Sequence, residues 1–286
     1  MTAANRVALA PGLYFLATPI GTARDITLRA LDILASADVL AAEDTRSLRK
    51  LMDIHGVALD GRPLISYHDH NGAKTRPALI AALEQGKSVA YASEAGTPLI
   101  ADPGYQLGRV AREAGHLVTA APGPSALLSA LTVSGLATDS FFFAGFAPNA
   151  SGQRQSFFRG LAEVPGTLVF YESPNRVAKS LADMVKVFGP EREAVMAREL
   201  TKKFEEVCRA QLGELALQMS ERKLKGEVVL LVARGEEAAL DEEAVRNMLK
   251  DALKSHSVKD AVSSIVQDTG WKRRDVYQMA LTLEKE

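Results

Sequence analysis

Short apolar runs alternate with amphipathic stretches through the first part of the chain. The runs predict strands at residues 13–18, 39–42, 64–67, 88–92 and 117–121. Between them, apolar residues recur at helical spacing, which predicts a helix from about Asp25 and another with Pro77 near its first turn and its end at Gly86. Regular alternation of strand and helix favours a mainly parallel sheet with helices on both faces.

The pattern restarts after residues 135–139, which marks a domain boundary. Strands are predicted at 141–143, 167–171, 194–198, 204–208 and 227–233, with helices at 153–162, 174–188 and from Gly213. Ser173 and Pro174 suit the N-cap and first position of a helix. Because several of these strands follow one another directly, the second sheet is expected to be mixed.

The last part of the chain has a helical pattern only. Three short helices are predicted at 241–254, 258–268 and 272–283, with Gly270 in the turn between the last two. This spacing resembles a helix-turn-helix. We therefore expect an α/β protein with a parallel-sheet N-terminal domain (1–122), a mixed-sheet second domain (123–235) and a small helical C-terminal module (236–286).

Unusual residues follow each of the first five strands. The segments are Pro19-Ile20-Gly21, Glu43-Asp44-Thr45-Arg46, His68-Asp69-His70-Asn71, Ser93–Pro98 and Pro122–Ser125. In a parallel sheet these strand ends lie at one edge, where open α/β sheets bind ligands. The segment SEAGTPLIADPG, residues 93–104, is the most distinctive, with Asp102 at an expected N-cap and Pro103 at the first helical position. The first loop lacks the three glycines of a dinucleotide-binding fingerprint, which argues against NAD or FAD.

Composition narrows the protein class without identifying a function. The 286 residues are 47% hydrophobic and 24% charged, as is typical of globular proteins, and the single cysteine, Cys208, fits a reducing compartment. No apolar stretch is long enough to span a bilayer and no secretory signal is evident, so a cytoplasmic location is expected. The formal net charge of −1 means that any contact with nucleic acid must come from local basic patches.

The 93–104 segment resembles the SDAGTPLxxDPG signature of the tetrapyrrole methylase superfamily, with Glu94 in place of the usual Asp. From about Gly12 to the end, the chain is most similar to the bacterial branch that methylates a ribose 2′-oxygen in small-subunit ribosomal RNA. The resemblance implies a two-domain fold, S-adenosylmethionine as cofactor, a cytidine in the decoding region of 16S rRNA as acceptor, either in naked rRNA or in the small ribosomal subunit, and a homodimer. It also implies cofactor contacts at Pro19, Glu94, Ala95, Gly96, Thr97, Ile100, Ser125, Ala126, Tyr171, Glu172 and Leu200.

Methyl transfer to a ribose hydroxyl benefits from a base that takes the hydroxyl proton. The candidates at the strand ends are His68, Asp44, Asp69, His70 and Glu172. His68 is preferred because imidazole titrates near neutral pH, and Asp44 comes second. The two histidines around Asp69 lack further ligands at suitable spacing, so no metal site is expected.

Two basic clusters are candidates for phosphate contact. Arg198, Lys202 and Lys203 follow a strand of the second domain, and Lys272, Arg273 and Arg274 open the last helix. The alternatives are solvated surface cations for the first cluster and a helical cap that binds nothing for the second. At the level of the whole chain, the alternatives are a tetrapyrrole C-methylase and a non-catalytic RNA-binding protein.

Overall fold

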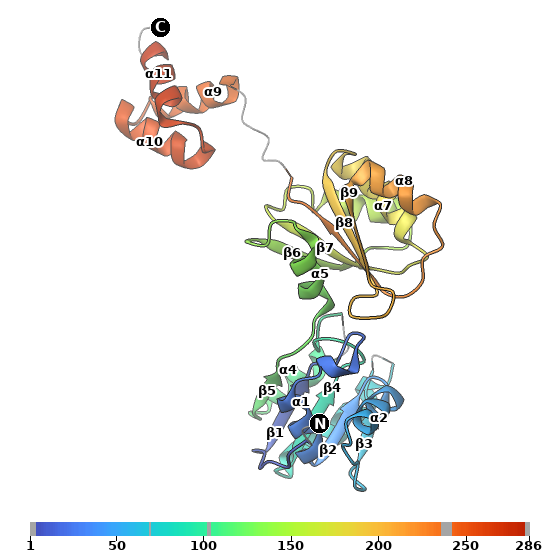
Figure 1. The fold of residues 1–286 in the computed structure, drawn as a ribbon. Coiled ribbons are helices and arrows are strands. Elements are labelled where there is room, and N and C mark those ends of the chain that lie inside the picture. The colour runs from blue at the N-terminus through green and yellow to red at the C-terminus, as the bar shows by residue number, and fades with distance from the viewer. Residues whose placement is uncertain (1–3, 69, 102–103, 236–241, 284–286) are drawn as a thin grey trace. The chain divides into compact units, whose positions relative to one another are not determined.

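The computed structural model describes residues 4–68, 70–101, 104–235 and 242–283. The chain divides into two compact units, residues 1–234 and 235–286, and each is considered by itself (Figure 1). The larger unit contains two five-stranded sheets and the smaller one contains helices. No described helix has both the length and the apolar character that crossing a lipid bilayer requires.

The first sheet is entirely parallel and confirms the predicted alternation. Its strands run in the order β3-β2-β4-β1-β5, and their bounds are β1 (Gly12–Leu16), β2 (Val39–Ala42), β3 (Leu64–Ser66), β4 (Ser88–Ala92) and β5 (Val118–Ala121). Successive side chains point to opposite faces, so Tyr14 and Leu16 enter one core while Leu13 and Phe15 enter the other. Because all strands are parallel, the loops that follow them lie at one edge of the sheet.

Four helices cover the two faces of this sheet. Helices α1 (Leu28–Ser36) and α2 (Thr45–Ile54) pack on one face, and α3 (Gly72–Glu84) and α4 (Tyr105–Glu113) pack on the other. The helix expected from Asp25 begins instead at Leu28, because Thr27 Oγ1 accepts the N–H of Ala30 at 3.2 Å. Residues 23–25 form a separate 3₁₀ turn, η1 (Ala23–Asp25).

Pro77 was expected near the first turn of its helix, and it is the sixth residue of α3, in the second turn. The helix starts early because the N–H of Gly72 donates to the carbonyl of His68 at 2.7 Å. The predicted N-cap Asp102 and the following Pro103 lie outside the described residues.

The second sheet is mixed, as predicted. Its order is β6-β7-β10-β8-β9, with the β6–β7 pair parallel and the other pairs antiparallel; the strands are β6 (Phe141–Phe146), β7 (Thr167–Glu172), β8 (Glu193–Arg198), β9 (Glu206–Gln211) and β10 (Val228–Val232). Helices α6 (Ser151–Arg159), α7 (Val177–Phe188) and α8 (Leu212–Ser220) pack against one face, and α5 (Ala126–Ser134) packs against the other.

Two expectations for this half were wrong in detail. Ser173 and Pro174 do not open a helix, since α7 starts at Val177. The N–H of Ser173 donates to the Glu172 carboxylate at 2.8 Å and the N–H of Arg176 donates to the Ser173 carbonyl at 2.8 Å, so the segment is held as a turn. The strand expected at 204–208 is β9, and Phe204 lies in the preceding loop with 63% of its surface exposed.

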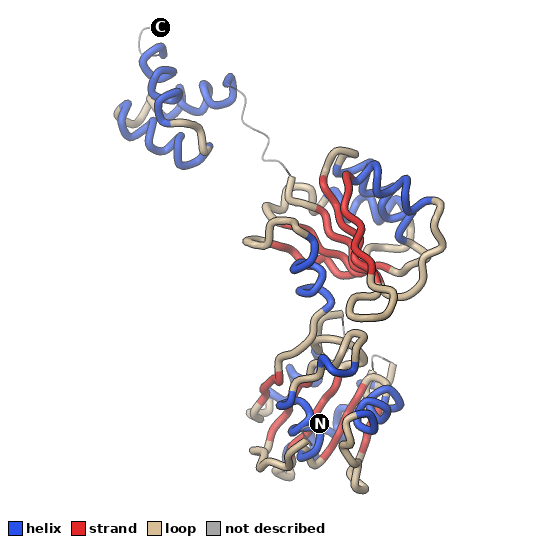
Figure 2. The backbone as a smooth tube through the Cα atoms, viewed as in Figure 1, coloured by secondary structure: helices blue, strands red, loops and turns tan. Residues whose placement is uncertain are grey.

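The smaller unit is a three-helix module with its own core. It consists of α9 (Glu242–Ala252), α10 (Val258–Thr269) and α11 (Arg273–Leu283), drawn as helices in Figure 2. Val245, Ile265 and Val276, one from each helix, are at most 3% exposed and form part of the core. Gly270 ends α10 with a φ of 66°, a left-handed conformation that glycine adopts at little cost.

Candidate active site

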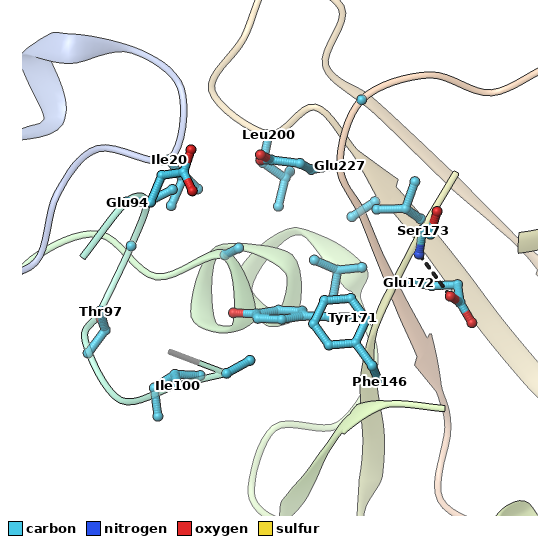
Figure 3. Close-up of a pocket in the computed structure, with 18 of the residues that line it drawn as sticks. Ile20, Glu94, Thr97, Ile100, Phe146, Tyr171, Glu172, Ser173, Leu200 and Glu227 are labelled. Carbon is cyan, nitrogen blue, oxygen red and sulfur yellow. Dashed lines mark hydrogen bonds between the residues drawn. The ribbon is translucent and has the colours of Figure 1, made fainter. Parts of the chain in front are cut away.

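A cavity of about 630 Å³ lies at the carboxyl edge of the first sheet and is closed by residues of the second sheet (Figure 3). Its walls come from strand-end loops of the first sheet, the first turns of α2 and α5, and residues in or next to β6, β7, β8 and β10. The lining residues are Ile20, Glu43, Ser47, Glu94, Ala95, Gly96, Thr97, Ile100, Ala101, Ala126, Phe146, Tyr171, Glu172, Ser173, Pro174, Ala197, Leu200, Gly226, Glu227, Val228 and Val229.

The loop after β4 is fixed by hydrogen bonds to neighbouring strand ends. Gly96 and Thr18 exchange two backbone hydrogen bonds, with N···O distances of 2.9 and 3.0 Å. Ser93 Oγ donates to the Gly96 carbonyl, and Thr97 Oγ1 donates to the Pro124 carbonyl at 2.9 Å. Gly96 has a φ of 82°, which other residues rarely adopt. The loop is therefore preorganised at the point where it forms the cavity wall.

The same loop continues through strained backbone. Leu99 and Ala101 have φ values of 70° and 57°, in the left-handed region that costs L-residues about 1–2 kcal/mol each. Ile100 lies between them and lines the cavity. Non-glycine residues held in this conformation cluster at ligand sites, where the surrounding structure enforces them.

The loop after β8 shows the same arrangement on the opposite wall. Glu199 and Thr201 have φ values of 51° and 63°, and Leu200 between them lines the cavity. Glu199 Oε1 accepts the N–H of Glu227 at 3.1 Å and the Lys202 ammonium at 2.9 Å. These bonds hold Leu200 over the cavity.

The two walls meet at the loop after β1. The N–H of Thr22 donates to Thr201 Oγ1 at 3.1 Å, and Ile20 packs in the same apolar cluster as Leu200. A Cβ atom on Gly21 would lie 2.5 Å from Lys202 Cγ and 2.6 Å from Thr201 Oγ1. Only glycine fits this contact without displacing the loop after β8.

Tyr171 and Glu172 form the wall at the end of β7. Tyr171 extends into the cavity beside Phe146, with ring centroids 5.8 Å apart (Figure 3), and burial raises the pKa of its hydroxyl. The Glu172 side chain is only 1% exposed and pairs with Arg176 at 3.2 Å. Its carboxylate also accepts hydrogen bonds from the N–H of Ser173 and from Ser180. Glu172 therefore holds the turn after β7, and its internal bonds make it a poor candidate for the base.

A second cavity of about 480 Å³ adjoins the first. It is lined by Glu43, Asp44, Thr45, Arg46, Ser66, His68, His70 and Glu94. Glu43 and Glu94 line both cavities. A ligand in one cavity can therefore meet a ligand in the other at these two carboxylates.

Three of the candidate bases, Asp44, His68 and His70, line the second cavity. Asp44 is the N-cap of α2, and its hydrogen bonds from the Arg46 side chain and backbone lower its pKa to about 2. Such a carboxylate is a weak base at neutral pH. His68 lies 5.9 Å from His70 between ring centroids, and within the described chain its buried Nδ1 has no hydrogen-bond partner. Asp69 lies outside the described residues.

The structure brings most of the predicted cofactor residues to the first cavity. Nine of the eleven line it, whereas Pro19 and Ser125 do not. Ser125 is the N-cap of α5, where its hydroxyl accepts the N–H of Leu128. Sequence reasoning missed the contributions of Phe146, Gly226 and Glu227. The signal available in the sequence was Gly226, a glycine shortly before the apolar run at 228–232. Its φ of 88° in the structure is an angle that other residues rarely adopt.

The predicted phosphate-binding residues differ in availability. Arg198 is paired with Glu206 at 3.0 Å, and Lys202 is paired with Glu199 and Glu227. Lys203 lies over the ring of Phe204. The basic residues at 272–274 are exposed at the start of α11. In the part of the chain that is described, no three His, Cys, Asp or Glu side chains are grouped to hold a metal ion.

Comparisons of the sequence with known proteins show which families the chain resembles. Residues 12–216 match the family model of Tetrapyrrole (Corrin/Porphyrin) Methylases, and residues 238–284 match that of the RsmI C-terminal HTH domain. The Ribosomal RNA small subunit methyltransferase I of Mesorhizobium japonicum is 45% identical over 277 residues, covering 96% of this chain and 93% of the relative. The enzyme of the same name from Vibrio cholerae is 43% identical, covering 95% of each chain.

The chain belongs to the ribosomal RNA small subunit methyltransferase I family.

Solved structures of more distant proteins share the fold of this methyltransferase I family member. A uroporphyrin-III C-methyltransferase from Thermus thermophilus, complexed with S-adenyl homocysteine, has a TM-score of 0.55 at 20% identity and covers 79% of this chain and 97% of its own. Diphthine synthase has a TM-score of 0.60 at 14% identity, covering 77% of this chain and 90% of its own. At these identities the likeness concerns the fold alone.

Proposed function

We propose that this protein transfers a methyl group from S-adenosylmethionine to the 2′-hydroxyl of a cytidine in the decoding region of 16S rRNA. The first cavity would hold the cofactor and the second the acceptor nucleotide. The observation that carries this proposal is the pair of adjoining cavities that share Glu43 and Glu94. The name shared by relatives at 43–45% identity supports small-subunit rRNA as the acceptor.

The residues of the first cavity fit this cofactor. Ile20, Ile100 and Leu200 offer apolar surface to an adenine ring, and Gly96 brings backbone close to the ligand. The glutamates of the wall suit its positive charge. When bound, S-adenosylmethionine supplies a methyl group on a positively charged sulfur.

The chain's own contribution to the reaction is positioning and proton removal. The fixed loops after β4 and β8 would hold both reactants in line, which supplies much of the acceleration. As the new O–C bond forms and the S–C bond breaks, the hydroxyl proton must leave. We propose that His68 takes it, because Asp44 is held ionised by Arg46 and Glu172 is engaged with Arg176. A positioned base contributes about 10²–10⁴-fold.

Further proposals concern the rest of the chain. We propose that residues 1–122 and 123–235 act as two domains around the cofactor, and that residues 236–286 contact RNA through Lys272, Arg273 and Arg274.

The exposed side chains of Phe141 and Phe142 on β6 support pairing of two copies as a homodimer. A cytoplasmic location follows from the rRNA substrate, and light scattering in solution tests the dimer.

Labelled methyl transfer tests the function. The protein is incubated with S-adenosylmethionine carrying a tritiated methyl group and either small ribosomal subunits that lack the modification, naked 16S rRNA, or a porphyrinogen. The proposal expects label in the ribosomal RNA and none in the porphyrinogen. Label in the porphyrinogen alone would make the protein a tetrapyrrole C-methylase. Binding of RNA without transfer to any acceptor would make it a non-catalytic RNA-binding protein.

A further inference from the structure

The charged side chains that line the first cavity, among the described residues, are all glutamates. They are Glu43, Glu94, Glu172 and Glu227, and no lysine, arginine or histidine of the described chain joins them. An anionic wall favours a cationic ligand. The positions of these carboxylates therefore indicate where the positively charged part of a ligand would lie.

Glu172 and Glu227 are both paired with cations. Glu172 is buried against Arg176 at 3.2 Å, and Glu227 pairs with Lys202 at 3.0 Å. Figure 3 shows the Glu172 carboxylate bonded back to Ser173, outside the open part of the cavity. Their net effect on a ligand is therefore reduced.

Glu94 differs from these two in position and exposure. It is exposed in the loop after β4 and lines both cavities, as does the half-buried Glu43. The nearby guanidinium of Arg46 is paired with Asp44 at 2.9 Å, so much of its positive charge is offset. Glu94 thus places an exposed carboxylate where the two cavities adjoin.

We propose that Glu94 makes the site discriminate between the methylated and demethylated forms of the cofactor by their charge at sulfur. The inference rests on the proposed function, because methyl transfer requires the sulfur to lie where the two cavities meet. S-adenosylmethionine carries a positive sulfur there, whereas the product S-adenosylhomocysteine has a neutral thioether. The product consequently loses an attraction that the substrate has.

The size of the effect follows from Coulomb's law. A carboxylate about 7 Å from a unit positive charge, at an effective dielectric constant of about 40, changes the affinity about five- to tenfold. The α-amino and carboxylate groups of the methionine part are the same in both forms. A carboxylate that acted on those groups would change the affinity for both forms equally.

Calorimetry with three ligands tests the proposal at low ionic strength. The ligands are S-adenosylmethionine, S-adenosylhomocysteine and sinefungin, which carries an amine-bearing carbon in place of the methylated sulfur and is cationic at that position. We expect Glu94→Gln to weaken the first and third about five- to tenfold and S-adenosylhomocysteine less than twofold. Glu94→Asp, which keeps the charge, should retain most of the discrimination.

Glu84→Gln is the matched control. It removes the same charge from an exposed position at the end of α3, which leads into β4 at the sheet edge opposite the cavities. Equal loss of affinity for all three ligands in Glu94→Gln would overturn the inference while leaving cofactor binding intact. If the unsubstituted protein binds none of the three, the proposed function fails and this inference fails with it.

Discussion

Gly21→Ala tests whether contact between the two walls controls cofactor affinity. The φ angle of Gly21 is not left-handed, so alanine meets no backbone penalty there. Its Cβ atom, however, would lie 2.5 Å from Lys202 Cγ, 2.6 Å from Thr201 Oγ1 and 3.0 Å from the Leu200 carbonyl oxygen. Because ordinary contacts begin near 3.4 Å, the loop after β8 must move back by several tenths of an ångström or more.

The expected magnitude combines two terms. Displacing the loop stretches the hydrogen bond from Thr22 to Thr201, which is worth about 0.5–1.5 kcal/mol, and overpacking of this kind costs about 1–3 kcal/mol. If about 1.5–3 kcal/mol of this loss falls on the arrangement of the walls that binds the cofactor, S-adenosylmethionine affinity falls roughly 10- to 150-fold. The melting temperature should change little, because the loop after β8 can move away from residue 21 without unfolding and because alanine restricts the unfolded chain.

Titration calorimetry with S-adenosylmethionine and a thermal melt measure both quantities. Gly152→Ala is the control, since a Cβ at that position on α6 meets no atom within 4 Å. It should leave affinity unchanged. If the affinity of Gly21→Ala lies within twofold of that of the unsubstituted protein, contact between the two walls does not control cofactor affinity and the reasoning is refuted.

Four further changes have expected outcomes. Gly96→Val, at a φ of 82°, should abolish S-adenosylmethionine binding in calorimetry while circular dichroism still reports a folded chain. His68→Ala and His68→Gln should both lower turnover about 10²-fold with unchanged cofactor affinity; loss in the Ala variant alone would indicate ribose positioning. Asp44→Asn should leave the pH dependence of turnover above pH 5 unaltered, because the pKa of Asp44 is lowered to about 2 and its carboxylate does not titrate there. Replacing the cations at 272–274 by Ala should flatten the salt dependence of RNA binding by about one unit of slope per lost phosphate contact; an identical slope would make the module a structural cap.

Much of the fold could be predicted because local patterns and tertiary structure agree. The apolar runs at 39–42 and 88–92 coincide with β2 and β4, since buried parallel strands require continuous apolar sequence. The position of Ser125 at the start of a helix was recognisable from the sequence. The sequence could not exclude Ser173 as an N-cap, because the hydrogen bond from its N–H to Glu172 depends on how β7 ends. Prediction of helix boundaries from the sequence fails where side chains outside the helix decide the hydrogen bonds at its ends.

Local sequence patterns indicated one wall of the site only, whereas Tyr171, Glu172 and Leu200 on the other wall were predicted from the family resemblance. The loop after β4 carries an unusual concentration of turn-forming residues, so its role is visible locally. Glu227 and Phe146, by contrast, are ordinary members of strand segments, and they reach the cavity because β10 and β6 lie in the sheet that closes it. The pairing of Arg198 with Glu206 and of Lys202 with Glu227 was likewise invisible, since Glu206 lies on the adjacent strand and Glu227 is distant in the sequence.

The central claim is that the two adjoining cavities place S-adenosylmethionine beside a ribose hydroxyl of small-subunit RNA, so that the methyl group is transferred to that hydroxyl. The most direct test is to digest tritium-labelled 16S rRNA after the reaction and to separate its nucleosides. The account predicts label in 2′-O-methylcytidine from one position in the decoding region, where the methyl group blocks alkaline cleavage of the chain. Label on a base, with alkaline cleavage intact at that position, would contradict it.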